Sequence, residues 1–463
     1  MKLKASLLTA LTIAFVPLSF AAAADQSASR ESYLKNEISD ENAFMPAPSL
    51  REEKYTAMEE SPFAFYRATN PLYYQDLSKG VIPVPSNWKT APNIQTFLQG
   101  DAHAENLGFF DNNNGEVVFD LNDFDESYKG PFYWDLIRFS SSIFLMADEA
   151  KNLSLSAQDK ENLVSSFLDT YQSTIESVNG NSSEDSIQLD EGYLKSGFVQ
   201  DELRHAKSSD SLAKLLSKWT VVSNGMRTFN WSNSNLAPAD SVKSAITASW
   251  PSYIQSLGSF GQSMPSGYFQ IKDAAKRLHS GLGSLGTDKY YVLIEGKTDS
   301  QDDDVLLQVK EQRLPSMFKE GSLSSSQYQD WFPAHAERSR TAAKALGIKT
   351  DNHLGTISFS GKSFRVERIS PYKEGISADD FNSRSDMEDF VKYSATAFAL
   401  AHARSDKDYN AAYVPYNYEQ GFLDAVAALP KVKTTILTLS ENYAAQVKAD
   451  YQMYLDLRNN GEL

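Results

Sequence analysis

Cysteine is absent from this sequence of 463 residues. Its absence excludes disulfide bonds, thiolate metal sites, cysteine nucleophiles and a lipid-anchored cysteine near the N-terminus. Long apolar runs are also missing, because no segment after the N-terminal one approaches the ~18 consecutive apolar residues of a membrane helix. The mature chain is therefore predicted to carry no membrane anchor. Hydrophobic residues still make up 41% of the sequence, enough for a large core and one or two domains.

Positive charge is in short supply. The chain has 44 Lys and Arg residues against 60 Asp and Glu residues, a formal net charge of -16. Such a chain repels phosphate backbones, so we do not expect a nucleic-acid partner.

The N-terminus has the composition of an export signal. "MKLKASLLTALTIAFVPLSFAAAADQ" combines Lys2 and Lys4, an apolar run and a small-residue "AAA" site. This pattern is typical of a secretory signal peptide over residues 1–24, cleaved after Ala24. A first core helix is the alternative, but Pro17 and the abrupt change to polar residues argue against it. The sequence thus predicts an exported protein, periplasmic or secreted.

Acidic side chains are dense in residues 100–126, "GDAHAENLGFFDNNNGEVVFDLNDFDE". Residues 94–99 are predicted to form a strand, and the two apolar runs that follow predict a β-hairpin. Its turn contains Asn114-Gly115, the dipeptide that type I′ turns favour. The hairpin places an entrance loop (residues 100–106) at one end and an exit loop (residues 122–126) at the other, so we expect the two loops to lie close together.

The rest of the chain predicts an α+β protein. Strands are predicted at 290–295, 305–310, "LGTISFSG" and "SFRVERI". Helices are predicted in "FYWDLIRFSSSIFLM", after Ser156, over most of 186–275, around 334–346, behind a Ser385–Glu388 capping box, and from Pro430 onwards. We divide the chain into the signal peptide, an N-terminal arm of short helices (25–98), a first large-lobe segment (99–275), a small-lobe segment (276–375), and C-terminal helices that complete the large lobe (376–463).

The residues of both loops suit phosphoryl transfer, which needs a base, oxygen ligands for Mg²⁺, a phosphate-holding loop and a cation. The entrance loop supplies Asp101 and Asn106, and the exit loop supplies Asp123 and Asp125. A Gly-rich turn, "GLGSLG" (residues 281–286), can wrap phosphates with backbone N–H groups. Two more side chains complete the set: Lys310 can provide the cation, and Glu337 can pair with it.

These motifs carry a resemblance. "GDAHAEN…VVFDLNDFDE…GPFYWDLIRF" is similar to the catalytic and metal loops of aminoglycoside and choline kinase-like phosphotransferases, although Gln99 stands where those relatives often have His. Together with "SPFAFYR", "GLGSLG", "VKEQRLPS" and "AHARS", the motifs resemble a bacterial family known as domain of unknown function 2252, a protein-kinase-like group. The likeness runs from about residue 55 to about residue 410.

The resemblance implies roles and a fold. Asp101 would be the catalytic base, with Asn106, Asp123 and Asp125 as metal contacts. The nucleotide would be held by Gly281, Gly283, Ser284, Gly286, Lys310 and Glu337. Kinases place the Gly-rich loop and lysine before the catalytic loop, whereas here they follow it. The resemblance therefore implies a two-lobed kinase-like fold, circularly permuted, with the helix 386–404 packed under the entrance loop.

The expected function is Mg²⁺-dependent transfer of a phosphoryl or nucleotidyl group from ATP or another nucleotide to an unknown acceptor. Two alternatives stay open: a non-catalytic protein that keeps the fold to bind a ligand or partner, and a metal-dependent hydrolase built on Asp101, His103 and Asp123. His103 is expected to shape its loop, and Asp135 to brace its own helix. His402 and Arg404 either complement a helix dipole or contact the entrance loop.

Overall fold

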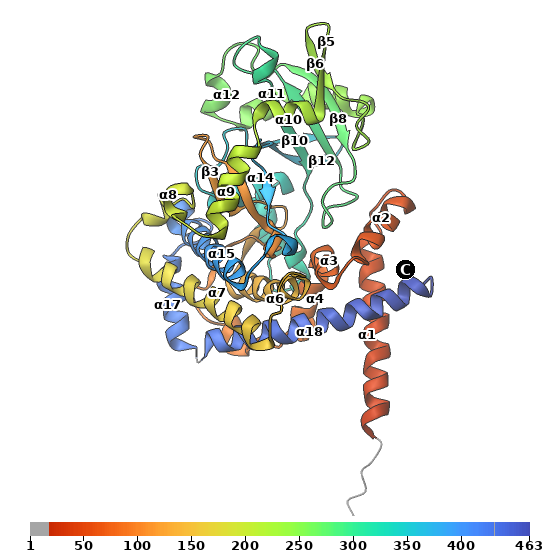
Figure 1. Cartoon of the computed structure of the whole chain (residues 1–463), viewed down its shortest axis with the longest axis vertical. Helices are drawn as coiled ribbons and strands as arrows, with labels where there is room; N and C mark the ends of the chain where they lie inside the picture. The colour runs from red at the N-terminus through yellow and green to blue at the C-terminus, as the bar shows by residue number, and fades with distance from the viewer. Residues whose placement is uncertain (1–17, 430) are drawn as a thin grey trace, which may run out of the picture.

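The computed structural model describes residues 18–429 and 431–463. Figure 1 shows a mainly helical region in its lower half and a β-rich region above it, with the hairpin strand β3 and helix α14 between them. The protein is thus a mixed α+β structure, as predicted. The predicted signal peptide lies largely outside the described residues.

Helix α6 (Tyr133–Glu149) is the centre of the helical region. Its residues from Tyr133 to Ala147 are all buried, as expected for a helix surrounded by other helices. Helix α18 packs along it, and α15 packs along α7. The helices of this region are α3 (Pro62–Ala68), α4 (Asn70–Lys79), α7 (Ala157–Val178), α15 (Arg384–Arg404), α17 (Tyr418–Ala428) and α18 (Val432–Asn459).

A six-stranded antiparallel sheet dominates the other region, in the order β11-β12-β10-β9-β8-β7. Its strands are β7 (Leu236–Pro238), β8 (Ile271–Arg277), β9 (Lys289–Ile294), β10 (Val305–Glu311), β11 (Gly355–Phe359) and β12 (Lys362–Arg368). The Gly-rich turn connects β8 to β9. Helix α14 (His335–Leu346) lies in the chain between β10 and β11.

The two faces of this sheet differ in chemistry. Alternate residues of a strand point to opposite faces. On β10, Leu307 and Val309 join an apolar core with helix α11 (Asp240–Ser256), so Lys310 belongs to the opposite face. Lys289 of β9 and Arg365 of β12 lie directly across from Lys310 in the strand register. Three buried cations therefore stand side by side on the inner face.

Smaller elements complete the fold. Strand β1 (Gln95–Leu98) pairs with β4 (Tyr128–Pro131), and β13 (Glu374–Gly375) joins the hairpin of β2 (Leu107–Asp111) and β3 (Val117–Leu121). Strands β5 (Thr220–Ser223) and β6 (Met226–Phe229) form a separate hairpin. The remaining helices are α1 (Leu18–Asn42), α2 (Pro48–Met58), α5 (Ser86–Lys89), α8 (Glu191–Leu194), α9 (Phe198–Ser209), α10 (Leu212–Trp219), α12 (Ser259–Ser263), α13 (Ser325–Trp331) and α16 (Lys407–Asn410).

Most predicted elements are confirmed. The strands at 94–99, 290–295, 305–310 and in the pair after 353 are present, as are the helices after Ser156, at 334–346 and after Pro430. The predicted arm is more regular than expected, because residues 25–42 all belong to the single long helix α1, which begins at Leu18. It is tied down by Arg30, which donates to the buried carboxylates of Asp76 (2.6 Å) and Asp450 (2.6 Å).

Two local predictions are wrong, and a third is incomplete. The stretch 186–275 contains helices α8 to α12, as predicted, but also the strands β5 to β8, which were missed because they are short and carry weak alternation. The N-cap of α15 is Ser383, boxed with Asp386, while Glu388 pairs instead with Arg384 (2.7 Å). The hairpin turn is not type I′. That type needs positive φ at both central residues, and here only Gly115 has it (78°).

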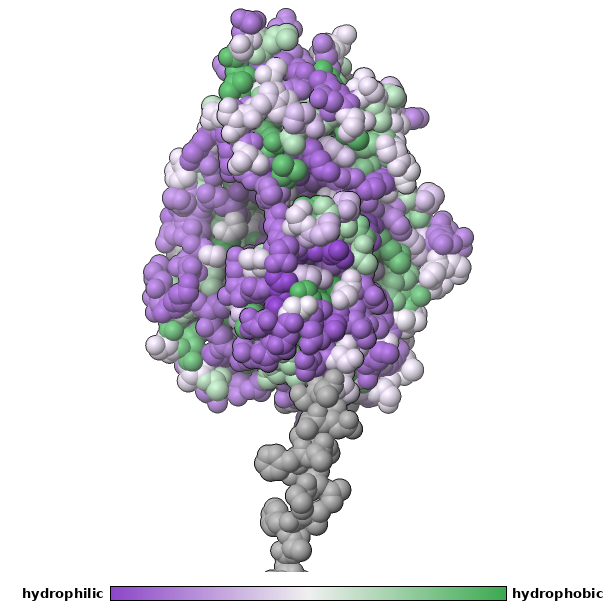
Figure 2. Space-filling view, turned by 90° about the vertical axis from the view of Figure 1, so that its right-hand side faces the viewer, coloured by the Kyte–Doolittle hydropathy of each residue, from purple (hydrophilic) through white to green (hydrophobic). Residues whose placement is uncertain are grey.

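Hydrophilic residues cover most of the face shown in Figure 2, and hydrophobic residues occur there in small separate groups. Within the described chain, no helix has both the length and the apolar composition that a membrane span needs.

Candidate active site

The hairpin brings the entrance and exit loops together, as predicted. The backbone N–H of Asn122 donates to the carbonyl of Asn106 (3.2 Å). Gln99 joins the loops more directly: its Oε1 accepts from the N–H of Asp101 (2.8 Å), and its Nε2 donates to the carbonyl of Asp123 (2.6 Å). Gln99 therefore holds both acidic loops in register.

Asp135 braces the entrance loop, whereas we expected it to brace its own helix. Its carboxylate accepts the N–H groups of Gln99 (2.7 Å) and Gly100 (3.1 Å). Gly100 has a positive φ of 82°, and a Cβ there would lie 2.2 Å from the carbonyl of Glu126. Only glycine fits, because the two loops touch at this point.

The C-terminal end of helix α15 contacts Asp135 and strand β1, next to the entrance loop. The Nε2 of His402 lies 3.3 Å from Asp135, and the carbonyl of His402 accepts from Thr96 of β1 (2.9 Å). His402 therefore contacts the carboxylate that holds the start of the entrance loop. Arg404 donates to the carbonyl of Leu346 (2.8 Å) instead and lies 3.4 Å from Asp120.

Asp101 is held by an arginine that the sequence did not reveal. Arg138 of α6 is fully buried and donates to one oxygen of Asp101 through Nε (3.0 Å) and Nη2 (2.5 Å). Burial raises the pKa of Asp101, and Arg138 opposes that rise. The second oxygen of Asp101 lies 3.7 Å from His103. Burial, together with Arg67 and Arg138, lowers the pKa of His103 well below its usual value, so this ring is neutral.

Lys310 meets the exit loop. Its Nζ lies 3.1 Å from Asp123 and also contacts Asp125, and Arg365 lies 3.2 Å from Asp125. Burial acts to raise the pKa of Asp123, but Lys310 and Arg365 hold it far below its usual value. Burial acts to lower the pKa of Lys310, but the two carboxylates raise it above its usual value. The inner face of the six-stranded sheet therefore meets the exit loop, which lies beside the entrance loop.

The expected ion pair between Lys310 and Glu337 is not formed between these two described residues. Glu337 contacts Arg340 (2.7 Å) and accepts from Thr356 (2.6 Å), while Lys310 is already neutralised by the exit loop. The neighbour of Glu337 makes the contact between α14 and the exit loop. Arg338 is buried and donates to the carbonyls of Asp125 (2.6 Å) and Ser127 (2.8 Å).

The Gly-rich turn lies over the entrance loop. A Cβ on Gly283 would be 3.9 Å from Asp101 and 3.5 Å from the carbonyl of Arg67. Gly281 has a positive φ of 78°. Lys289 follows the turn, and its Nζ donates to the carbonyl of Ser280 (3.3 Å). Burial and the nearby Lys310 lower the pKa of Lys289 to about 7.

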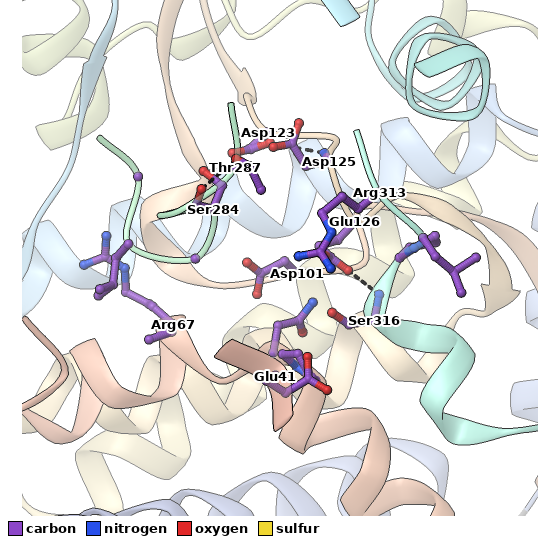
Figure 3. Close-up of a pocket in the computed structure, with 18 of the residues that line it drawn as sticks. Glu41, Arg67, Asp101, Asp123, Asp125, Glu126, Ser284, Thr287, Arg313 and Ser316 are labelled. Carbon is purple, nitrogen blue, oxygen red and sulfur yellow. Dashed lines mark hydrogen bonds between the residues drawn. The ribbon is translucent and has the colours of Figure 1, made fainter. Parts of the chain in front are cut away.

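The entrance loop, the exit loop and the Gly-rich turn border a cavity of about 400 Å³, which we call the main cavity. Figure 3 shows Asp101 near its centre, Asp123 and Asp125 at one side, and Ser284 on the turn above Asp101. The predicted site residues in its lining are Asp101, Asn106, Asp123, Asp125, Gly281, Gly283 and Ser284. Gly286 is not among them, because it packs against Met45. Lys310 reaches the cavity through its contacts with Asp123 and Asp125.

The donor set suits Mg²⁺ better than a softer metal. Asn106 uses its Nδ2 to donate to the carbonyl of Asp101 (2.9 Å), which leaves its side-chain oxygen to act as a ligand beside the carboxylate of Asp123. No cluster of three or more His, Asp or Glu residues in the described chain is arranged to hold a metal. Mg²⁺ does not need one, since it binds through one or two carboxylates, substrate phosphates and water.

Comparison with known proteins identifies a family. The model of the family described as "Uncharacterized protein conserved in bacteria (DUF2252)" matches residues 47–457. Searches of curated proteins and of solved structures found no significant match.

Proposed function

We propose that this chain, which belongs to the DUF2252 family of bacterial proteins, catalyses a Mg²⁺-dependent transfer. The group transferred is a phosphoryl or nucleotidyl group, which passes from a nucleotide to an acceptor. One observation carries this proposal: Asp101, Asp123 and Lys310, distant in the chain, meet at the main cavity under a Gly-rich turn.

The order of the sheet supports a protein-kinase-like fold. In protein kinases a Gly-rich loop covers the phosphates, and the phosphate-binding lysine is on the third strand. Here the turn joins the first two of three neighbouring strands, β8 and β9, and Lys310 is on the third, β10. The entrance and exit loops precede this sheet in the chain, so we infer a circular permutation of the kinase order.

Each residue then has a chemical role. Asp101 takes the proton of the acceptor hydroxyl while the hydroxyl oxygen bonds to phosphorus and the bond between phosphorus and the leaving phosphate oxygen breaks. Arg138 fixes the orientation of Asp101. Asp123 and Asn106 would hold Mg²⁺, which neutralises charge on the phosphates. Lys310 would exchange a carboxylate for a phosphate oxygen, and Lys289 lies at the base of the turn to support it.

One observation favours the non-catalytic alternative. Active kinases need an ion pair between the sheet lysine and a helix glutamate, and Glu337 pairs with Arg340 instead. We place the protein outside the cytoplasm, from the pattern of residues 1–24. The periplasm holds little ATP, so other nucleotides and other phosphate donors should be tested for binding as well.

Thermal unfolding of the mature protein tests the proposal, with ATP alone, with Mg²⁺ alone and with both. Asp123→Asn and Lys310→Met are the test variants. The matched controls are Asp111→Asn, at the other end of the hairpin, and Lys272→Met, a half-buried lysine of β8 that pairs with Asp304 (2.8 Å) away from the main cavity.

We expect nucleotide to raise the melting temperature only with Mg²⁺ present, and both test variants to abolish the shift while the controls keep it. Stabilisation by Mg²⁺ alone that Asp123→Asn removes favours the hydrolase. Nucleotide binding without turnover favours the non-catalytic protein. A nucleotide shift that survives both test variants contradicts the proposal.

A further inference from the structure

The main cavity is lined by both signs of charge, and most of these charges are already paired. Arg67 is bound to Glu105 (2.6 Å), and Lys319 is bound to Glu37 (3.5 Å) and Glu41. The carboxylates of Asp101, Asp123, Asp125 and Glu311 are likewise bound by Arg138, Lys310, Arg365 and Lys362.

Two cations in the lining of the main cavity have no salt-bridge partner among the described residues. Lys54 of α2 and Arg313, which follows β10, have no carboxylate partner within salt-bridge distance among residues 29–429 and 431–463. The guanidinium of Arg313 lies over the ring of Phe44, 3.6 Å from its centre. In Figure 3 it lies between Asp101 and Glu126. Glu126 is engaged by the backbone N–H of Ser316 (2.5 Å).

Lys54 is the more unusual of the two, because it is only 5% exposed and no described group accepts a hydrogen bond from its Nζ. Buried lysines are rare unless they are paired. Burial, together with Arg313, lowers the pKa of Lys54 to about 8, although Glu126 and Asp101 act in the opposite direction. An unpaired ammonium and a guanidinium that face one cavity form an anion-binding arrangement.

We propose that Lys54 and Arg313 form a subsite for an anionic group, a carboxylate or a phosphate, on the acceptor. That this group belongs to the acceptor and not to the nucleotide rests on the proposed function. In that function the nucleotide phosphates are served by Lys310, Lys289 and the Gly-rich turn, which come from the sheet. Lys54 comes from helix α2, in the N-terminal arm, and Asp101 lies within electrostatic reach of it. An acceptor with its anion here would present a hydroxyl to Asp101.

Isothermal titration calorimetry on the full mature chain tests this subsite. The probes are inorganic phosphate and acetate, titrated with and without a saturating non-hydrolysable nucleoside triphosphate and Mg²⁺, which fill the nucleotide site. The test variants are Lys54→Met and Arg313→Gln. The matched controls are Lys319→Met and Arg67→Gln, cations of the same lining that are already paired.

We expect phosphate, acetate or both to bind the nucleotide-filled protein. Each test variant should weaken that binding at least about tenfold, as expected when a charge-assisted hydrogen bond is lost, and the controls should stay within about threefold of wild type. Phosphate binding alone assigns a phosphate-bearing acceptor, and binding of both assigns a carboxylate or phosphate.

Two results would overturn the subsite: no anion binding by the wild-type protein, or equal binding by Lys54→Met and Arg313→Gln. Failure of the proposed function has a different signature. In that case the nucleotide and Mg²⁺ would not bind, while the anion would still bind in a Lys54-dependent way.

A stability measurement separates this role from a structural one. A lysine held for a ligand costs stability in the free protein, so Lys54→Met should melt at a higher temperature than wild type, by roughly 2 °C or more. Saturating phosphate should stabilise the wild type and not the variant. A lower melting temperature for Lys54→Met without any loss of anion binding would show that Lys54 is structural.

Discussion

Two lysines at the main cavity are buried alike and yet differ in their surroundings. Lys310 is 5% exposed and lies between Asp123 and Asp125, which raise its pKa. Lys54 is also 5% exposed, has no salt-bridge partner among the described residues, and has a lowered pKa. The first arrangement is neutralised from within the protein. The second has no carboxylate within salt-bridge distance among the described residues, and a bound anion would supply that negative charge.

On the proposal above, this contrast separates a cation that belongs to the fold, Lys310, from a cation that is kept for a ligand, Lys54. Removing one partner from a buried pair leaves an uncompensated charge and destabilises the protein strongly. Removing an unpaired buried charge does the opposite. Substitutions at the two kinds of cation should therefore change stability in opposite directions, and four predictions test that difference.

The largest effect should come from Arg138, the paired cation at Asp101. Arg138→Met leaves the buried carboxylate of Asp101 without its partner, so we expect the free energy of unfolding to fall by about 3–5 kcal/mol. Urea denaturation measures this. The exposed pair between Arg384 and Asp159 is the control, since Arg384→Met should cost far less than Arg138→Met. Equal losses would remove the distinction between buried and exposed pairs.

Lys310→Met should also destabilise the protein, by about 3 kcal/mol near neutral pH. The effect should depend on pH. The lowered pKa of Asp123 contributes stability above its unfolded pKa of about 3.9, and that contribution is lost as the pH falls below that value. The gap between variant and wild type should therefore narrow between about pH 5 and pH 3. A gap that widens towards acid would mean that Lys310 does not stabilise the ionised carboxylates.

Lys54→Met should show the opposite sign and a different pH range. Because the pKa of Lys54 is lowered to about 8, the unfolded chain binds the proton more tightly than the folded protein does. Wild-type stability should therefore rise between about pH 8 and pH 10.5 from this residue, and the advantage of the variant should shrink over that range. Thermal melts at pH 7, 8, 9 and 10 measure it. An advantage that is constant with pH would assign the effect to packing.

Glu337→Gln should have the smallest effect. Glu337 pairs with Arg340 three residues along the same helix, a contact worth less than about 1 kcal/mol at the surface. Nucleotide-induced stabilisation should be unchanged in this variant. Loss of that stabilisation would show that Glu337 moves to Lys310 when the nucleotide binds, as the family resemblance implied. It would also weaken our contrast between Lys310, which is paired within the protein, and Lys54, which is not.

The sequence predicted the parts of the site that lie in local motifs. The hairpin between residues 100 and 126, the strand of Lys310 and the convergence of Asp101 with Asp123 all follow from turn residues, alternation and the family motifs. Arg138 was missed although it stands in an apolar helix, where a charged residue signals a buried partner. Its partner, Asp101, is 37 residues away in the chain.

Other features had no local signal at all. Lys54 and Arg313 come from α2 and from the segment after β10, and only the folded chain brings them to one cavity. Glu337 was assigned by its place on a helix, but side-chain pairing depends on the nearest opposite charge, and Arg340 lies closer. The role of Gln99 also required the structure, because one of its two hydrogen bonds reaches Asp123, 24 residues away in the chain.

A crystal structure of the protein with Mg²⁺ and a non-hydrolysable nucleoside triphosphate would test the central claim most directly. We expect the phosphates to lie in the main cavity beneath residues 281–284, with Lys310 moved from Asp123 to a phosphate oxygen and the metal bound to Asp123 and Asn106. A nucleotide bound elsewhere, with the salt bridge between Lys310 and Asp123 intact, would contradict the account.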